Sequence, residues 1–198
     1  MFFCLKRALT LNMFLCSYYL KRTWLFLCLI LASCQAEAPF SRKYSCQFVF
    51  SYDQHPTSLL FAAARSAGTY VYVTASGDGS SSFRHIYVTS NDGKTPREDN
   101  VISTEIEKRT ACILGASNNI GLIIGMTNFN GLWAYDRSCP NCTNLQALDW
   151  TGNRQQVACP KCKRTYDLET GSITNGEPGE SLLRYLCAFD GTLLRAWN

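Results

Sequence analysis

The sequence has only two histidines, His55 and His85, and it lacks the motifs that define several common enzyme classes. It contains no phosphate-binding P-loop, no glycine-rich dinucleotide motif and no serine set in a nucleophile elbow. A cysteine nucleophile needs an imidazole base beside it, and only these two histidines could supply one. These absences argue against those enzyme classes, and the sequence identifies no catalytic residue.

Acidic residues are absent before Cys34, whereas four basic residues lie there. The remaining 15 basic and 15 acidic residues all follow Cys34, so this larger part of the chain carries no net charge. Proteins that bind nucleic acid need clustered lysine and arginine to displace counterions from phosphates. The charge distribution therefore argues against nucleic acid as a partner.

The first 34 residues have the features of an export signal. Lys21 and Arg22 precede the uncharged run 24–32, which is too short to cross a bilayer as a mature helix. A short buried helix is the alternative, but the run has neither an amphipathic period nor a helix cap. Leu31-Ala32-Ser33-Cys34 resembles the lipobox of bacterial lipoproteins, in which the cysteine is acylated and becomes the first mature residue.

We therefore expect residues 1–34 to be a lipoprotein signal peptide, starting at Met1 or Met13, with Cys34 as the lipidation site. Acylation would attach the protein to a membrane of the cell envelope, on its periplasmic face or outer surface. Residues 35–42 would form a tether, and residues 43–198 a single domain.

Segments rich in β-branched and aromatic residues dominate this domain and predict strands. The predicted strands are 45–50, 70–74, 85–89, 111–115, 121–125 and 132–135. A short helix is predicted over 56–64, ending by Gly68. Helical periods long enough to build a bundle are absent, so the sequence predicts an all-β sandwich or barrel.

Aromatic residues and isolated cysteines of the domain are expected to serve mainly as core. Six aromatic residues are predicted to be core or cross-strand partners: Phe129, Trp133, Tyr135, Tyr166, Tyr185 and Trp197. Cys46, Cys112 and Cys187 lie in apolar strands, where a free thiol behaves as a small buried hydrophobe. An exported protein can oxidise its thiols, so one disulfide among these three remains open.

Four other cysteines form a motif with metal-ligand spacing. Cys139-Pro140-Asn141-Cys142 is followed, after sixteen residues, by Cys159-Pro160-Lys161-Cys162. Two residues between cysteines let both sulfurs point at one ion, and the sixteen-residue segment can bring the two turns together. The alternative is two disulfides, but a CxxC disulfide closes a tight, strained loop. The spacing therefore predicts a metal site within about residues 137–166.

Zinc is the first choice for four thiolates, and iron, as a single ion or a 2Fe-2S cluster, is the alternative. With all four positions taken by sulfur, the ion has no open site for a water molecule. This arrangement favours a structural role over hydrolysis.

The pattern from residue 132 to 198 resembles a Rieske domain. In that family a strand enters a Cys-x-His loop, a Cys-x-x-His loop follows, and an aromatic-Asp-Leu-x-x-Gly strand comes next. The segments that correspond to these three parts are 134–139, 159–162 and 166–171. Segment 176–185 is similar to the Gly-Pro-Ala-x-x-Pro-Leu-x-x-Tyr stretch of the family, and 191–194 is similar to the Gly-x-Leu strand that follows it. The resemblance implies a Rieske-like fold with a small two-loop metal subdomain, similar to a zinc ribbon, and the chain looks like the Rieske-like lipoproteins of Bacteroidetes.

The ligands depart from the Rieske pattern. Rieske clusters use two histidines on one iron. Here Cys142, or Asn141 by strict spacing, stands in the first histidine position and Cys162 in the second. We therefore expect an envelope lipoprotein with a four-cysteine metal centre that serves as a structural or interaction module, with electron transfer through an all-cysteine iron centre as the alternative. The sequence does not identify its protein partner.

Overall fold

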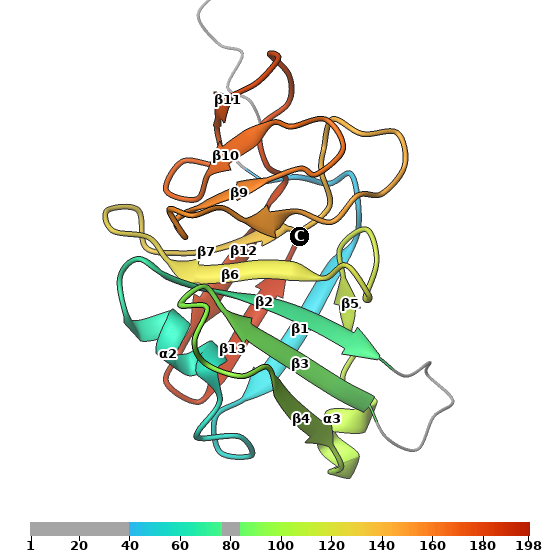
Figure 1. Ribbon diagram of the computed structural model, residues 1–198. Helices are drawn as coiled ribbons and strands as arrows, with labels where there is room; N and C mark the ends of the chain where they lie inside the picture. Colours follow the sequence, from blue (N-terminus) through green and yellow to red (C-terminus); the bar gives the residue numbers. More distant parts are fainter. Residues whose placement is uncertain (1–39, 77–83) are drawn as a thin grey trace, which may run out of the picture. The chain divides into compact units, whose positions relative to one another are not determined.

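Two antiparallel sheets make up the protein, as seen in a computed structural model that describes residues 40–76 and 84–198 (Figure 1). The larger sheet has the strand order β4-β3-β2-β6-β7-β12-β13-β1-β5, and the smaller has the order β11-β10-β9-β8. The all-β prediction is confirmed. The predicted signal peptide 1–34, the lipidation site Cys34 and most of the tether lie outside the described residues.

The larger sheet contains nine strands. They are β1 (Cys46–Ser51), β2 (Thr69–Ser76), β3 (Arg84–Ser90), β4 (Glu98–Ile102), β5 (Ile113–Leu114), β6 (Leu122–Met126), β7 (Leu132–Asp136), β12 (Arg184–Phe189) and β13 (Leu193–Trp197). The smaller sheet consists of β8 (Asp149–Trp150), β9 (Gln156–Ala158), β10 (Thr165–Asp167) and β11 (Ile173–Asn175). Two short helices, α2 (Leu59–Arg65) and α3 (Glu105–Arg109), complete the described elements, and neither is long or apolar enough to span a membrane.

The larger sheet curls around one hydrophobic cluster. Strands from both ends of its order contribute to this cluster, for example Val88 of β3 and Phe50 of β1. Helix α2 adds Leu60 and Phe61, which are almost completely buried. Because α2 packs on β2, β3 and β6, it covers the inside of the curled sheet. The larger sheet and α2 therefore form the barrel-like body of the domain.

Strand β6 lies between two cores, which explains its apolar sequence. Leu122 and Ile124 point into the barrel cluster, whereas Ile123 points into a second cluster on the opposite face. A strand that is buried on both faces has no polar alternation, unlike β1, whose exposure alternates. The second cluster joins the outer face of the larger sheet to Val157 of β9 and Tyr166 of β10.

We call this second region the lobe: residues 137–183, with the smaller sheet, packed on the outer face of β2, β6 and β7. In Figure 1 the lobe and α2 lie on opposite sides of β6. The rings of Tyr72 and Trp150 stack in parallel across the junction, with centroids 3.9 Å apart. The guanidinium of Arg137 lies 3.9 Å from the Tyr72 ring centroid. Aromatic contacts therefore hold the lobe on the barrel.

Some details differ from the sequence predictions. Helix α2 begins at Leu59, because the Ser58 hydroxyl caps the Leu60 amide, and it ends at Arg65 before Gly68. Phe129 was predicted to be core but lies on the β6–β7 loop with 90 % of its surface exposed. Trp197 pairs across strands with Gln47 yet remains 38 % exposed, because it points outward from β13.

Candidate metal centre

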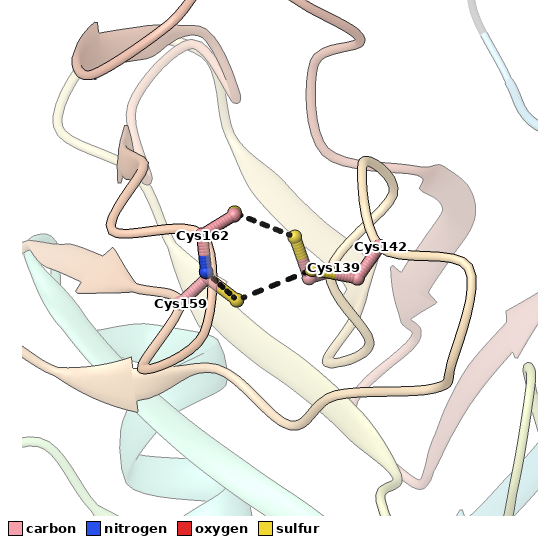
Figure 2. Close-up of side chains that lie close together, drawn as sticks. All are labelled: Cys139, Cys142, Cys159 and Cys162. Atoms are coloured by element: carbon pink, nitrogen blue, oxygen red, sulfur yellow. Dashed lines mark hydrogen bonds between the residues drawn. The ribbon is translucent and has the colours of Figure 1, made fainter.

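Four cysteines from two loops of the lobe come together at one point. Cys139 and Cys142 lie in the loop that follows β7, and Cys159 and Cys162 lie in the β9–β10 hairpin. Their sulfur atoms all lie within 4.8 Å of one another (Figure 2). Between the loops, the sulfur–sulfur distance is 3.6 Å for Cys139 and Cys162 and 3.7 Å for Cys142 and Cys159. The predicted convergence of the two pairs is confirmed.

These distances fit a single tetrahedral ion. With zinc–sulfur bonds of about 2.3 Å, the sulfurs of a regular tetrahedron lie about 3.8 Å apart. All seven cysteines in the described part of the chain are free thiols, so neither CxxC pair is closed as a disulfide. The four thiols could therefore hold one metal ion, and their number and type suit zinc or iron.

The second loop is shaped by backbone hydrogen bonds of the β9–β10 hairpin. The Cys159 amide donates to the Arg164 carbonyl at 2.9 Å, and the Lys163 amide donates to the Cys159 carbonyl at 3.0 Å. Lys163 has a φ of 62°, the left-handed conformation that reverses the chain after the second cysteine. The Cys162 amide then points at the Cys159 sulfur, 3.5 Å away. Amides aimed at sulfur stabilise thiolate charge.

The first loop is held at its base by a buried carboxylate at the end of β7. Asp136 has no exposed surface, and its Oδ1 accepts from the Ser138 amide at 2.7 Å. Its Oδ2 accepts from the Ala116 amide and from the Tyr185 hydroxyl, both at 2.8 Å. Asp136 therefore joins β12 and the β5–β6 connection to the residues that lead directly into Cys139.

A third segment, residues 176–182, closes over the first loop. The Asn141 amide group donates to the Glu180 carbonyl at 2.7 Å and accepts from the Glu180 amide at 2.8 Å. The same Asn141 group donates to the Tyr166 hydroxyl at 2.9 Å, and that hydroxyl lies 3.4 Å from the Cys139 sulfur. At Gly179, a β-carbon would lie 2.2 Å from the Asn141 Oδ1, so this close approach requires glycine.

Arg164 connects the same segment to the second loop. Its side chain donates to the carbonyls of Glu177, at 2.8 Å, and Pro178, at 3.2 Å. It also hydrogen-bonds the Cys162 sulfur, as does the Arg164 backbone amide. Asn141 and Arg164 therefore hold the two cysteine loops against one common segment.

Burial divides the four thiols into two kinds. Cys139 and Cys159 are almost fully buried, whereas Cys142 and Cys162 are partly exposed. Burial raises the pKa of Cys139 to about 12. Burial alone would raise the pKa of Cys162 as well, but its hydrogen bonds to Arg164 and the neighbouring thiols lower it to about 6. Without metal, Cys162 is therefore the thiolate that an entering cation meets at the surface.

The cysteine spacing predicts the four thiols but not the groups that position them. Asn141 had been a candidate for the first histidine position, and the structure instead places Cys142 with the other sulfurs. The roles of Tyr166 and Arg164 depend on residues 176–182 folding back over the loops. His55 pairs with Glu107 at 3.1 Å and His85 with Asp99 at 2.7 Å, so both histidines lie outside the cysteine cluster.

The three cysteines outside the motif in residues 40–198 behave as expected of apolar residues. Cys46 belongs to the barrel cluster, and Cys112 and Cys187 pack against it while remaining partly exposed. Burial raises the pKa of Cys46 and of Cys187 to about 12. None of the three is in a disulfide.

No known protein family, curated protein or solved structure matches this chain.

Proposed function

We propose that Cys139, Cys142, Cys159 and Cys162 bind one zinc ion, which serves to hold the lobe together. The observation that carries this proposal is the 3.6 Å and 3.7 Å spacing of sulfurs between the two loops. This spacing matches the edge of a tetrahedron around one ion. Four thiolates fill the coordination sphere, which leaves no position for a reacting water molecule.

The size of the lobe supports a structural role for the ion. Its strands are only two or three residues long, and the two cysteine loops meet at the four sulfurs, which lie within 4.8 Å of one another. Strands of this length form a marginal sheet by themselves. A metal that joins both loops supplies folding free energy directly, since the ligands converge only in the folded state.

A single iron ion in the same tetrahedron is the second candidate, and the exposure of two ligands favours it. Cys142 and Cys162 are partly exposed, so an electron donor could approach within a short distance of the ion. A 2Fe-2S cluster fits less well, because each pair of thiolates would bind a different iron atom and the pairs would lie farther apart than in one tetrahedron. The iron site would make the protein an electron carrier.

Elemental analysis of protein purified without oxygen tests both candidates. Zinc binding predicts one zinc per chain and a colourless preparation, whereas a single iron predicts a red preparation that loses its colour on reduction. Cys159→Ser should lose the metal, and Cys187→Ser, at a partly exposed thiol outside the cluster, should keep it. A wild-type protein without stoichiometric metal would overturn both candidates.

We also propose that the protein is a lipoprotein of the cell envelope, attached to the membrane through acylated Cys34. The support comes from the basic pair, the uncharged run 24–32 and the lipobox-like Leu31-Ala32-Ser33-Cys34. In a bacterial host, the full chain should fractionate with membranes and incorporate labelled palmitate. Cys34→Ala should abolish the incorporation, and equal labelling of both proteins would contradict the anchor.

We further propose a distant relationship to Rieske proteins. The relationship would account for one cysteine loop that follows β7, a second within the β9–β10 hairpin, and residues 176–182 lying against the first loop. In this proposal cysteine replaces both histidine ligands. Restoring them, as Cys142→His with Cys162→His, should yield the absorption spectrum of a Rieske cluster after reconstitution with iron and sulfide. If the double variant does not assemble the cluster, the site is purely mononuclear and the proposed relationship is contradicted.

A further inference from the structure

The loop between β6 and β7, residues 127–131, presents an aromatic ring to solvent. Phe129 is 90 % exposed, whereas the other exposed large hydrophobic residues in the described ranges reach at most 45 %. These are Val101, Ile113, Leu145 and Trp197. At this exposure the Phe129 ring contributes nothing to the core and is accessible to a partner.

The loop is held rigidly in the conformation that exposes the ring. The Glu169 carboxylate accepts from the amides of Asn128, at 2.7 Å, and Phe129, at 2.9 Å, and from the side chain of Asn130 at 2.8 Å. Within the loop, the Thr127 amide donates to the Gly131 carbonyl at 2.9 Å, and Thr127 Oγ1 accepts from the Asn130 amide at 2.8 Å. These bonds prevent the ring from folding back onto the barrel.

The chain enters the domain beside the same hairpin. The Phe40 ring centroid lies 4.7 Å from the Arg184 guanidinium, which lies 4.3 Å from the Trp133 ring centroid. The Ser41 amide donates to the Arg184 carbonyl at 2.7 Å. Trp133 belongs to β7, the strand that starts directly after the Phe129 loop. The first described residue is therefore fixed to the strand that supports Phe129.

The segment from Cys34 to Phe40 is too short to hold the domain far from a membrane to which Cys34 is anchored. Phe40 is six residues after Cys34, so even a fully extended segment reaches only about 20 Å. If Cys34 carries lipid, Phe40 lies within about 20 Å of the bilayer surface, and its contact with Arg184, which lies against Trp133, keeps the start of β7 near that level. Residues 127–131 carry no charged side chain, and Phe129 is the apolar part of a tip that also presents Asn128 and Asn130, both hydrogen-bonded to the Glu169 carboxylate.

We propose that Phe129 inserts into the surface of the lipid bilayer and fixes the orientation of the tethered domain. The proposal rests on the lipid anchor at Cys34 that is proposed above. One buried aromatic ring is too weak to bind a membrane alone, but it favours one orientation by roughly tenfold once a tether holds the domain there. The contact is apolar, so it requires neither anionic lipid nor low salt.

Tryptophan fluorescence in vesicles tests the proposal. The full chain, purified from a bacterial host, is reconstituted in zwitterionic vesicles with and without brominated lipid. Phe129→Trp, after subtraction of the signal from the native tryptophans of the wild-type protein, should show blue-shifted emission that brominated lipid quenches at least twofold more than in the control, Ile113→Trp. Ile113 is 41 % exposed on β5, so it matches Phe129 as an outward-facing apolar site.

Two further variants separate this inference from the anchor itself. Adding Glu169→Ala to Phe129→Trp should reduce the quenching, because the loop loses the carboxylate that holds the ring outward. Cys34→Ala should remove the protein from vesicles. If the wild-type protein floats with vesicles and Cys34→Ala does not, but Phe129→Trp is quenched no more than Ile113→Trp, the anchor stands and the insertion of Phe129 is overturned. If the wild-type protein does not float, both fail.

Discussion

The barrel and the lobe contain the same residue type in two different roles. In the barrel, Cys46 packs among phenylalanine, leucine and valine side chains, and burial raises the pKa of its thiol to about 12. In the lobe, Cys162 is partly exposed, and its hydrogen bonds lower the pKa to about 6. The surroundings therefore determine whether a cysteine packs as an apolar core residue or is suited to bind a metal.

The two regions also differ in what stabilises them. The barrel has strands of five to eight residues, apart from the two-residue β5, around a large cluster that includes Phe48, Phe50 and Leu122. The lobe has strands of two or three residues and four thiols that converge. We therefore expect hydrophobic burial to dominate the stability of the barrel and metal binding to dominate that of the lobe. The following changes test this contrast, from the largest expected effect to the smallest.

Cys159→Ser is expected to have the largest effect, on the order of 5 kcal/mol, because structural metal sites contribute folding free energy directly. The loss should be confined to the lobe. Hydrogen exchange should show amides of residues 137–183 losing protection while β2 and β3 keep theirs. Cys187→Ala serves as the control, and equal loss of protection in barrel and lobe would contradict separate sources of stability.

Phe50→Ala should destabilise the barrel by about 3–5 kcal/mol, because it removes a ring that is 1 % exposed in the cluster. The metal content should remain unchanged under native conditions. Urea denaturation and metal analysis of the same preparation measure both quantities. The neighbouring Val49→Ala, at a position that faces outward, should cost far less; a loss of metal from Phe50→Ala would show that the two regions fold as one unit.

Asp136→Asn should affect both regions, by about 1–3 kcal/mol, since this buried carboxylate accepts three hydrogen bonds at their junction. An asparagine amide group cannot accept from all three donors. Because the Ser138 amide leads into Cys139, metal affinity should also fall about tenfold, which competition with a chelator measures. Asp149→Asn, an exposed carboxylate in the lobe, should change neither quantity.

Protonation of Glu169 should have the smallest effect, limited to residues 127–131. Partial burial opposes ionisation, but hydrogen bonds from the Asn128 and Phe129 amides and from the asparagine side chains hold the pKa of Glu169 below its usual value of 4.5. The carboxylate therefore orders the loop above about pH 4.5, and this contribution is lost as the pH falls through the lowered pKa. The Phe129 amide resonance should follow this titration, and Glu169→Gln should eliminate it.

The sequence predicted the barrel better than the lobe, for physical reasons. Strands β2, β3, β6 and β7 have runs of β-branched and aromatic residues, and all four were located. Strand β4 was missed because its sequence, Glu-Asp-Asn-Val-Ile, is that of a polar edge with only Ile102 buried. The strands of the lobe are shorter than any hydrophobic period can reveal.

The candidate site was predictable in its ligands and not in its surroundings. Cysteine spacing alone identified the four sulfurs, because the two-residue interval limits how each pair can point. Asn141 contacts Glu180, 39 residues later in the sequence, and Arg164 contacts Pro178, 14 residues later. No local sequence pattern predicts contacts between residues so far apart in the chain. The exposure of Phe129 was also hidden, since composition favours burial of an aromatic ring, whereas the loop conformation depends on hydrogen bonds to the distant Glu169.

Strand β1 pairs along its length with β13, so that Gln47 faces Trp197, a partner synthesised about 150 residues later. Until β13 has been synthesised, β1 lacks this partner and its phenylalanines remain uncovered on that side. This delay exposes aggregation-prone strands, so we expect the protein to depend on a chaperone before the barrel closes.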